Sequence, residues 1–465
     1  MSSGRSTAEA VPLPIELARD SGVPLAVQLA DRLRDGAAAG QLRVGDRLPS
    51  TRTLARQLQV SRTVTAAAYE QLHAEGWIDG RHGSGTYVTT TPPGSRPRPL
   101  PSRTTPRPAT EPVDLAPGAP WLEGMDRAAW RRAWRAAADA APLLRPQRAG
   151  LMEYREVVAE HLLRHRGLRV ASEADVLATG GTTSAVSELA VAALRPGDAV
   201  AVEEPGYQRA VQAFRAAGLR VLPVDVDAGG LLVDALPTGV RAVYCSPAHQ
   251  YPLGGRMSAG RRVALVELAR ARSMLVVEDD YDGELRYDVA PLPLLAALAP
   301  DVVVHLGTTS KIVTSTLGAG WMVAPPRVAG AVLAHRERTG TSPSAAGQRV
   351  LVELARHGDL GRHLRRVRRE LSERRERIVG ALADAGVAVL GDDAGAHVTV
   401  PLPSGQAERT VIAAAAHRGI KLDGLARHHD GHPRWHGIAL GYTACTSAEL
   451  DAVLPELVAL LPENR

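Results

Sequence analysis

A proline-rich segment divides this sequence into two parts that must fold separately. Residues 89–112, TTTPPGSRPRPLPSRTTPRPATEP, contain eight prolines and four arginines but almost no large apolar side chain. Proline lacks a backbone donor and favours extended polyproline geometry, so such a stretch forms neither a helix nor the interior of a sheet. Periodic sequence lies on both sides of it. We therefore expect a semi-rigid linker at 89–112 between a small domain at 11–88 and a large domain at 113–465.

The segment before the linker has the pattern of a winged helix-turn-helix. Leucines recur every four residues from Leu25 to Leu33, which predicts an amphipathic helix. Two short helices follow, and Ser50 and Ser61 are placed to cap them. The stretch GWIDGRHGSGTYV then predicts two short strands around a glycine-rich tip. A plain three-helix bundle is the alternative, which the predicted hairpin disfavours.

The charge distribution of this segment favours DNA as its partner. Between Arg47 and Tyr69 there are four arginines and no acidic residue, although the whole chain has a net charge of only +5. In helix-turn-helix proteins the first residues of the second helix meet base edges, while flanking residues hold the phosphate backbone. The residues expected to contact bases are Arg62, Thr63 and Thr65. The residues expected to contact phosphate or the minor groove are Ser50, Arg52, Arg81, His82 and Gly83.

The chain after the linker alternates apolar strands with helices. The stretches DAVAVEEP, RAVYCSP, MLVVEDD and DVVVHLGTTSK are each followed by polar or glycine-rich turns. This order predicts an α/β fold with a largely parallel sheet. Ligands of such sheets lie beyond the carboxyl ends of the strands, which is where Asp279 and Lys311 fall.

Lys311 is conspicuous because lysine is rare in this chain. Of the 55 lysines and arginines together, only Lys311 and Lys421 are lysines. A guanidinium stays protonated, whereas a buried ammonium can lose its proton and attack a carbonyl to form a covalent linkage. A carbonyl cofactor such as pyridoxal 5'-phosphate (PLP) is therefore the partner to consider for Lys311. We expect Lys421 to be an ordinary surface lysine.

The residues near Lys311 in the predicted sheet match what PLP needs. A carboxylate should face the pyridine nitrogen, and Asp279 is the candidate, with Asp280 expected to face solvent. Tyr281 is placed to donate to the ring hydroxyl, and Tyr207 is available to cover the ring face. The phosphate needs backbone amides at a helix N-terminus, together with hydroxyl groups. The candidates for this end are Gly180, Gly181, Thr182, Thr308 and Ser310.

Both parts of the chain resemble known families. Residues 11–88 resemble the GntR-type winged-helix DNA-binding domain, through GDRLPSTRTLARQLQVSRTVTAAAYEQLHAEGWIDGRHGSGTYV. Residues 113–465 resemble a fold-type I aminotransferase domain, the aspartate aminotransferase type, through EEPGYQRA, SPAHQYPLGGRMS, VVEDDYDGELRY and LGTTSKIVTSTLGAGWMVAP. A winged helix joined by a proline-rich linker to such a domain is the layout of the MocR (GabR-like) regulators.

This resemblance implies a transcriptional regulator that binds a double-stranded DNA operator and holds PLP. The effector that it senses would be an amine, an amino acid or PLP itself. By resemblance, Lys311 links covalently to the cofactor, while Asp279, Tyr281 and Tyr207 take the roles given above. The loop that lines the ring in this family contains His249 and Gln250. The resemblance also implies a homodimer with a head-to-tail, domain-swapped arrangement.

Three positions depart from the pattern of that family. Gly318 stands where an arginine usually clamps the cofactor phosphate, which implies weaker phosphate binding. Arg145 replaces a tyrosine that usually reaches the phosphate of the partner subunit, and it is a candidate for supplying the missing charge. Ala439 stands where aminotransferases carry an arginine that grips the substrate carboxylate. Arg434 and Arg209 are the candidate substitutes for that arginine.

These departures keep two alternatives beside the regulator with a PLP-dependent sensor domain. An active aminotransferase with an appended DNA-binding module would need a grip for the substrate carboxylate, which the sequence does not make evident. A regulator whose site no longer keeps the cofactor would respond to a different ligand. The sensor is the preferred hypothesis because it requires no such grip and no catalytic turnover.

Other features of the sequence have structural interpretations. The arginines of residues 361–379 flank apolar residues at helical spacing, so we expect them to form a solvated face. The histidines of residues 427–436 lack carboxylate or cysteine partners at metal-binding spacing, so no metal site is expected. Two cysteines, no apolar run of membrane-spanning length and no stretch like a signal peptide favour the cytoplasm.

Overall fold

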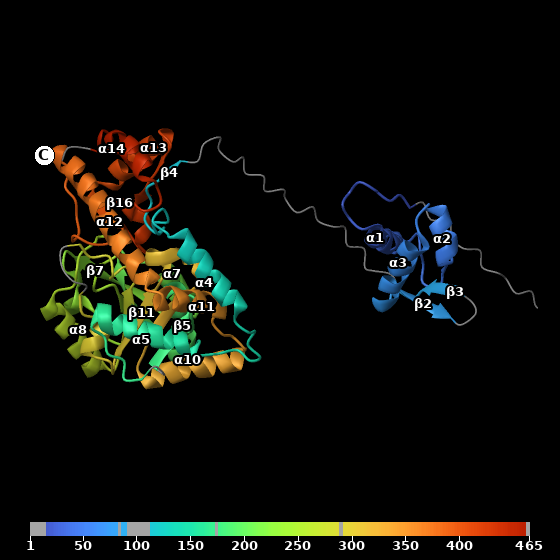
Figure 1. The fold of residues 1–465 in the computed structure, drawn as a ribbon, viewed down its shortest axis with the longest axis horizontal. Coiled ribbons are helices and arrows are strands. Elements are labelled where there is room, and N and C mark those ends of the chain that lie inside the picture. The colour runs from blue at the N-terminus through green and yellow to red at the C-terminus, as the bar shows by residue number, and fades with distance from the viewer. Residues whose placement is uncertain (1–14, 82–84, 91–111, 173–174, 288–291, 462–465) are drawn as a thin grey trace, which may run out of the picture. The chain divides into compact units, whose positions relative to one another are not determined.

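The computed structural model describes residues 15–81, 85–90, 112–172, 175–287 and 292–461. Contacts within the chain divide it into two compact units, Met1–Arg107 and Pro108–Arg465 (Figure 1). The units have separate hydrophobic cores. Most of the predicted linker, from residue 91 to residue 111, lies outside the described residues.

The smaller unit packs three helices against a three-stranded sheet. Its elements are α1 Leu25–Ala38, β1 Arg47–Leu48, α2 Thr51–Gln57, α3 Arg62–Ala74, β2 Ile78–Arg81 and β3 Gly85–Val88. The strands lie in the order β1-β3-β2, and β2 and β3 form an antiparallel hairpin. Ser50 and Ser61 cap α2 and α3 by accepting hydrogen bonds from the backbone amides of Thr53 and Val64. The predicted winged helix-turn-helix is confirmed.

The apolar faces of these helices form the core of the smaller unit. Leu29 and Leu33 of α1 are buried and belong to one cluster with Leu54 and Leu72. Leu25, at the start of α1, is only half-buried. Because helices of this length are marginal alone in water, this shared burial is what stabilises them.

An eight-stranded sheet organises the larger unit. Its strands lie in the order β5-β12-β11-β10-β9-β6-β7-β8. Neighbours are parallel except that β12 is antiparallel to β5 and β11, and β8 is antiparallel to β7. The strands are β5 Val176–Thr179, β6 Ala199–Glu204, β7 Arg220–Asp227, β8 Gly230–Leu231, β9 Val240–Cys245, β10 Leu275–Asp280, β11 Val303–Thr308 and β12 Gly320–Val323. The predicted α/β fold with a largely parallel sheet is confirmed.

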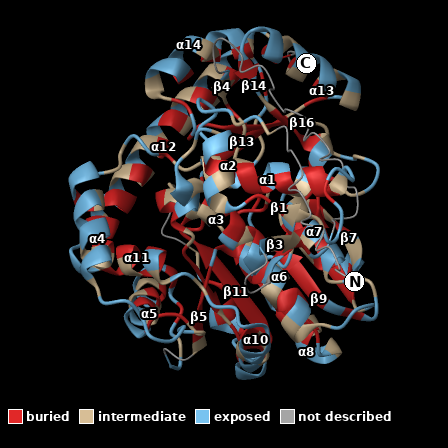
Figure 2. Ribbon diagram, turned by 90° about the vertical axis from the view of Figure 1, so that its right-hand side faces the viewer, coloured by how far each residue is buried: buried red, intermediate tan, exposed pale blue. Residues whose placement is uncertain are grey.

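Both faces of this sheet are buried. Every residue of β6, β10 and β11 is buried, and β11 is coloured red in Figure 2. Val276 belongs to one apolar cluster and Val277 to the other, and successive side chains of a strand point to opposite faces. The helices of this region are α4 Arg127–Asp139, α5 Met152–Arg166, α6 Thr182–Ala193, α7 Gln208–Ala216, α8 Ala259–Arg272, α9 Leu295–Leu298, α10 Pro326–Thr339 and α11 Ala345–Arg356.

The C-terminal part of the larger unit carries a second, smaller sheet. Strands β13 His397–Pro401, β16 Gly437–Gly441 and β15 Asp423–Gly424 are antiparallel neighbours in that order. The short strand β14 Ile420–Lys421 pairs with β4 Val113–Asp114. The helices here are α12 Asp359–Asp384, α13 Gly405–His417 and α14 Ser447–Val458.

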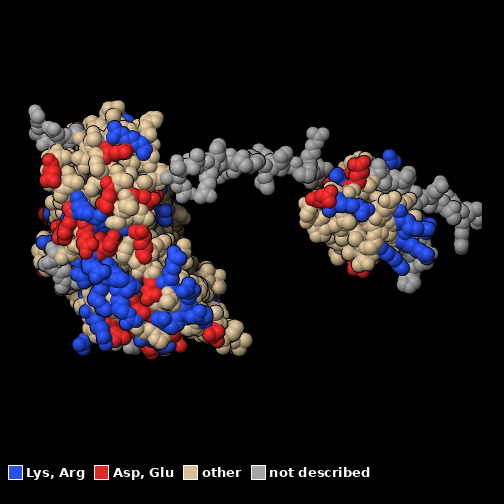
Figure 3. All heavy atoms as spheres, turned by 45° about the horizontal axis from the view of Figure 1, so that its top comes forward, with Lys and Arg blue, Asp and Glu red and all other residues tan. Residues whose placement is uncertain are grey.

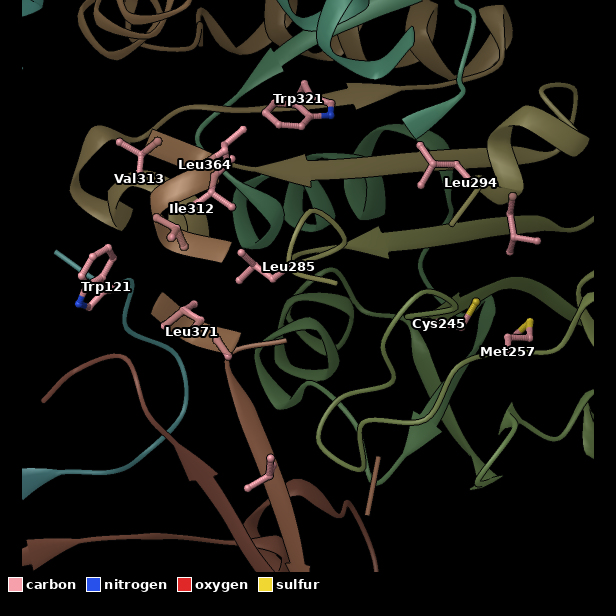
Figure 4. Close-up of a cluster of buried hydrophobic side chains, with 14 of the residues drawn as sticks. Trp121, Cys245, Met257, Leu285, Leu294, Ile312, Val313, Trp321, Leu364 and Leu371 are labelled. Carbon is pink, nitrogen blue, oxygen red and sulfur yellow. The ribbon is translucent and has the colours of Figure 1, made fainter. Parts of the chain in front are cut away.

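Helix α12 connects the C-terminal part to the core beneath the large sheet. Leu364 and Leu371 of α12 lie in the same buried cluster as Leu285, Ile312 and Val313 (Figure 4). Ile312 and Val313 are the two residues that follow Lys311 in the chain. Their burial therefore anchors the backbone that carries the lysine.

The arginines of residues 361–379 do not all face solvent, which corrects the prediction of a solvated face. Arg365 and Arg369 are exposed, but Arg374 is fully buried. Its guanidinium donates to the carbonyl oxygens of Tyr442 and Cys445 at 3.1 and 2.7 Å. The backbone acceptors of the C-terminal part supply partners that the helical pattern of α12 does not reveal.

None of the helices in the described part of the chain is long and apolar enough to span a membrane.

Candidate functional site

Lys311 lies at the end of a central strand of the sheet. It belongs to a π-helical turn, Ser310–Thr314, that begins just after β11. Its ammonium group donates to the carbonyl oxygen of Gly118 at 2.6 Å. Burial lowers the pKa of Lys311, while the nearby charges of Asp282 and Asp279 oppose that shift. A lowered pKa favours the neutral amine, which is the nucleophilic form.

Asp279 is the second-last residue of the neighbouring strand β10. One of its carboxylate oxygens accepts from the hydroxyl of Tyr244. The other, Oδ1, is buried and has no hydrogen-bond partner within the described part of the chain. Burial raises the pKa of Asp279 to about 7, and the bond from Tyr244 opposes this shift. A buried carboxylate oxygen without a partner is unfavourable, so it indicates a place where a ligand donates.

A glycine turn in front of α6 forms a cup beside β11. Gly181 has a φ of +113°, a conformation that favours glycine, and Thr182 begins the helix. A Cβ atom on Gly181 would lie 3.3 Å from Oγ1 of Thr308, so the turn approaches the strand closely. The Thr308 hydroxyl donates to the Ser310 hydroxyl at 2.8 Å. Backbone amides at a helix start, together with these hydroxyls, suit an anion such as a phosphate.

These groups line one cavity of about 510 Å³. That volume lies within the usual range for small-molecule sites. Tyr207 is held at its edge by a hydrogen bond of 2.9 Å with the hydroxyl of Thr183. The predicted cofactor residues that line the cavity are Lys311, Asp279, Tyr281, Tyr207, Gly181, Thr182, Thr308 and Ser310.

Two other predicted residues, Gln250 and His249, lie behind the cavity wall. The side-chain amide of Gln250 is fully buried and donates to the carbonyl oxygens of Pro205 and Tyr251. It therefore holds the loop together and does not line the cavity, which differs from its expected place in the wall around the ring. His249 is also buried, and its Nδ1 lies 3.0 Å from the hydroxyl of Tyr281, so it meets the cavity only through that tyrosine.

Asp280 is buried, and the prediction that it faces solvent is wrong. Its carboxylate pairs with Arg166 of α5 at 2.5 Å, and both side chains are almost fully buried. A guanidinium that is buried needs a counter-ion, and Asp280 supplies it from the opposite side of the strand from Asp279. The partner is 114 residues away in the sequence, so local pattern does not reveal it.

The cavity has further walls that the sequence analysis missed. These lining residues include Tyr251, His397, Arg427 and His428. The ring of Tyr251 meets the rings of Tyr207 and Tyr281 edge to face, with centroids 6.3 and 5.9 Å apart. His397, Arg427 and His428 come from the C-terminal part and approach only when the two sheets pack together. The one available signal was Tyr251, which directly follows the predicted Gln250.

Arg434 and Arg209, the candidates for binding a substrate carboxylate in place of the missing arginine, lie in different surroundings. Ala439 is fully buried on β16. Arg434 pairs with Glu204 and Asp225, so its charge is already compensated by the protein. Arg209, the other candidate, lines the cavity.

Arg427 is a second guanidinium in the cavity wall. It pairs with Asp423, to which it donates at 2.6 Å. The neighbouring His428 also contacts this carboxylate, at 3.2 Å, so the histidine-rich segment does have an acidic partner. That partner comes from β15, outside the segment itself.

Gly318 and Arg145, two of the departures from the family pattern, both lie outside the described cavity lining. Gly318 has a φ of +60° at the end of a short helical turn, Ser315–Leu317, and a Cβ there would meet nothing within 4 Å. Arg145, the other candidate for phosphate charge, is exposed and is absent from the cavity lining of its own chain. The basic residues among the described lining are Lys311, Arg209, Arg427, His397 and His428.

The predicted DNA-contacting residues lie on α2, on α3 and in the hairpin of the smaller unit. Arg52, Arg62 and Thr63 are exposed in the first turns of α2 and α3. Ser50 is exposed as the cap of α2. Most basic side chains visible on this unit gather on one side of it (Figure 3). Arg81 is in β2, while His82 and Gly83 lie outside the described residues.

Thr65 is a core residue of α3, and the prediction that it contacts bases is wrong. Its side chain is fully buried. Its hydroxyl donates to the carbonyl oxygens of Thr51 and Arg62 at 2.9 and 3.0 Å. Thr65 therefore ties α3 to α2 and is not available to DNA.

Comparison with known proteins identifies both units. The model of the gntR family of bacterial regulatory proteins matches residues 25–88, and that of aminotransferase class I and II matches residues 112–421. The chain is 35% identical over 450 residues to the HTH-type pyridoxine biosynthesis transcriptional regulator PdxR of Corynebacterium glutamicum, covering 96% of this chain and 98% of that protein. It is 31% identical over 458 residues to the probable rhizopine catabolism regulatory protein MocR of Rhizobium meliloti, covering 92% and 91%. The chain belongs to the MocR-like subfamily of GntR regulators.

As a MocR-like protein, this chain is an HTH-type transcriptional regulator with an aminotransferase-like domain. Relatives that match nearly the whole chain are named as regulators. This supports a transcriptional regulator over an active aminotransferase with an appended DNA-binding module. The larger unit resembles the kynurenine aminotransferase of Pyrococcus horikoshii with a TM-score of 0.69 and 26% identity, over 76% of this chain and 91% of that one. An archaeal alanine:glyoxylate aminotransferase matches with a TM-score of 0.71 and 24% identity, over 77% and 92%. The predicted fold-type I architecture is confirmed.

Proposed function

We propose that this regulator binds PLP through Lys311 and that occupancy of the cavity controls its binding to a double-stranded DNA operator. The observation that carries the proposal is the pairing of Lys311 with Asp279 in one cavity. Lys311 has a lowered pKa, and Asp279 has a buried oxygen without a partner. The proposed domains are the winged helix at 11–88, the linker at 89–112 and the effector domain at 113–465.

The lining residues suit the different ends of PLP. When bound, PLP supplies a carbonyl carbon for a lysine amine and an electron-withdrawing ring. Asp279 would accept from the ring nitrogen, which satisfies its free oxygen. Tyr281 would donate to the ring oxygen, and Tyr207 would cover the ring. The cup residues Gly181, Thr182, Thr308 and Ser310 would hold the phosphate.

A cup without an arginine supports a sensing role. Gly318 contributes no charge, so phosphate binding rests on amides and hydroxyls, which bind more weakly than a bidentate guanidinium. A site of moderate affinity fills and empties as the concentration of its ligand changes. PLP itself is therefore one candidate effector. The name of the relative PdxR, a regulator of pyridoxine biosynthesis, supports this choice.

Amines and amino acids are the second class of candidate effector. Lys311 provides a site where an amine can compete for the same carbonyl carbon. Arg209 and Arg427 line the cavity and provide positive charge for a carboxylate. Of the two, Arg427 is already paired with Asp423, so Arg209 is the better candidate.

Control of DNA binding requires that the ligand distinguish two arrangements of the protein. A ligand shifts an equilibrium only by its difference in affinity for the two states, and the effect is reciprocal. We propose a homodimer, head-to-tail and domain-swapped, whose two winged heads take different relative positions in these states. Operator DNA would then change the affinity for PLP by the same factor as PLP changes the affinity for operator.

The test compares the full-length protein with variants at its two lysines. Operator DNA selected from a random pool is titrated with wild type, Lys311→Ala and Lys421→Ala, with and without PLP. Lys421 is exposed and paired with Asp114, so it is the matched control. We expect PLP to give a visible absorbance band in wild type and Lys421→Ala only, and borohydride to fix one cofactor mass on the peptide containing Lys311. Operator affinity that is identical with and without PLP would refute the sensing role, and no fixed mass would refute PLP binding.

A further inference from the structure

A buried histidine and a buried aspartate stand in line behind Tyr281. The hydroxyl of Tyr281 lies 3.0 Å from Nδ1 of His249. The same Nδ1 lies 2.9 Å from Oδ2 of Asp282. Both side chains behind the tyrosine are almost fully buried, with 3% and 1% of their surface exposed. Neither His249 nor Asp282 lines the cavity itself.

Nδ1 of His249 cannot donate to Asp282 and accept from Tyr281 at the same time. If Nδ1 carries a proton, it donates to Asp282 and has no lone pair for Tyr281. If Nδ1 is bare, it accepts the proton of the Tyr281 hydroxyl, and an ionised Asp282 is left without a donor. Within the described residues, the bond to His249 is the only one made by the Asp282 carboxylate. An unpaired buried carboxylate is strongly unfavourable, so the first arrangement is favoured.

We propose that Asp282 and His249 are positioning residues that direct the Tyr281 hydroxyl proton into the cavity. Asp282 keeps a proton on Nδ1, and Nδ1 therefore cannot accept from Tyr281. The hydroxyl must then find its acceptor on the cavity side, where the ring oxygen of PLP would lie. This inference rests on the proposed function, because it concerns how Tyr281 meets the cofactor.

The histidine that packs against His249 is uncharged at ordinary pH. His397 packs against His249 with ring centroids 5.1 Å apart and donates from Nε2 to the carbonyl oxygen of Pro252 at 2.9 Å. Burial lowers the pKa of His397 to about 4, so it is neutral at ordinary pH. The other titratable groups that interact with this region are Tyr251, Tyr281, Tyr287, Tyr442, Asp279, Lys311 and His428.

The test uses the visible absorbance of PLP bound to the full-length protein as a function of pH. A hydroxyl that donates to the ring oxygen stabilises negative charge there and weakens the hold of that oxygen on the proton of the linked lysine nitrogen. Asp282→Asn removes the negative charge that holds the proton on Nδ1, because a neutral amide is not destabilised beside a bare Nδ1, so Tyr281 can turn toward His249. We expect the pH midpoint of the absorbance change to rise by about one unit, as a lost hydrogen bond to a charged group would cause. Tyr281→Phe should produce the same rise.

Combined variants separate this role from general damage to the site. In the Tyr281→Phe background, Asp282→Asn should cause no further shift. His249→Phe combined with Asp282→Asn leaves Tyr281 no acceptor behind it, so the midpoint should return toward the wild-type value. The matched control is Glu284→Gln, because Glu284 forms a buried pair with His161 at 2.9 Å that does not line the cavity. This control should leave the midpoint unchanged.

Several outcomes would overturn the proposal. The positioning role fails if Asp282→Asn leaves the midpoint unchanged while Tyr281→Phe moves it, or if the shifts of the two variants add. If Asp282→Asn does not fold, nitrogen-15 NMR of the His249 ring in the wild-type protein carries the test, and an Nδ1 without a proton would overturn the proposal. A stoichiometric divalent metal in purified protein that is lost in His397→Ala would replace the hydrogen-bonded pair by a metal site. If wild type shows no PLP band, the proposed function fails, and this inference fails with it.

Discussion

Replacing Asp279 by Asn should have opposite effects on the empty protein and on the PLP-loaded protein. Burial raises the pKa of Asp279 from its ordinary value of 3.8 to about 7. A group that is harder to ionise when folded destabilises the folded state wherever the unfolded chain is ionised. Asn is nearly isosteric, carries no charge and can still accept from the Tyr244 hydroxyl with its amide oxygen.

The magnitude follows from the pKa difference. Below pH ~4 Asp279 is protonated in both states and affects stability little. As pH rises from ~4 to ~7 the unfolded chain loses its proton and the folded chain keeps it, so stability falls. Above pH 7 the loss is complete, and about three pKa units at ~1.36 kcal/mol each give about 4 kcal/mol. Between pH ~5 and ~8.5 the advantage of Asp279→Asn should therefore grow by about 3 kcal/mol.

The assay is thermal unfolding of cofactor-free protein at these two pH values, followed by tryptophan fluorescence. Five of the six tryptophans belong to the larger unit, so its transition dominates the signal. At about 2.1 cal/mol/K per residue over roughly 360 residues, 3 kcal/mol corresponds to roughly 4 °C in Tm.

The neighbouring aspartate provides a matched control with the opposite expectation. Asp280→Asn leaves Arg166 buried without a counter-ion and should cost about 3–5 kcal/mol at both pH values. With PLP added, Asp279→Asn should gain less Tm than wild type, because it lacks the charge that faces the ring nitrogen. An advantage of Asp279→Asn that is the same at both pH values would refute the reasoning.

Three further predictions concern the DNA surface and the phosphate cup. Arg62→Ala should weaken operator binding by ~1–3 kcal/mol and relax specificity at one base pair, which mobility shifts on single-base operator variants measure; equal weakening on all sequences would make Arg62 a phosphate contact. Thr65→Val should lower the free energy of unfolding of the smaller unit by ~1–2 kcal/mol, measured by denaturant titration, because the hydroxyl proton shared between the carbonyl oxygens of Thr51 and Arg62 is lost. A changed base preference in that variant would contradict the burial of Thr65. Gly318→Arg should tighten PLP binding in an absorbance titration, since a charge-assisted bond contributes ~1.5–3 kcal/mol, while the left-handed strain is the same with and without PLP and lowers only folding stability. Unchanged or weaker binding would show that the cup does not lack charge at this position.

The sequence predicts most of the residues that line the candidate cavity, because these residues are local to strand and helix ends. Asp279 and Lys311 follow recognisable buried strands, and Gly181 precedes a recognisable helix. Each of these roles depends on a few neighbouring residues and on the rule that the strand ends of a parallel sheet meet. The same locality explains the success of the caps Ser50 and Ser61.

The predictions that failed depend on partners or directions that local pattern does not carry. Asp280 looks like a turn residue until Arg166, far away in the chain, is packed against it. Arg427 reaches the cavity only because the C-terminal part packs over the large sheet. The burial of Thr65, by contrast, could be predicted from the sequence. Thr65, Ala68, Tyr69 and Leu72 have the i, i+3, i+4, i+7 spacing of a buried helix face, and that spacing outweighs proximity to the helix start.

The contrast between the two lysines explains what this cavity retains of an aminotransferase and what it has lost. Lys421 is exposed and paired with Asp114, a role that any arginine could take. Lys311 lines the cavity with a lowered pKa, and only an amine could form the covalent linkage that we propose there. The arginines that would grip a phosphate and a substrate carboxylate are replaced by Gly318 and Ala439. An enzyme needs both grips to orient a substrate for turnover, whereas a sensor needs only reversible occupancy that favours one state. The function proposed for this cavity needs only the second of these.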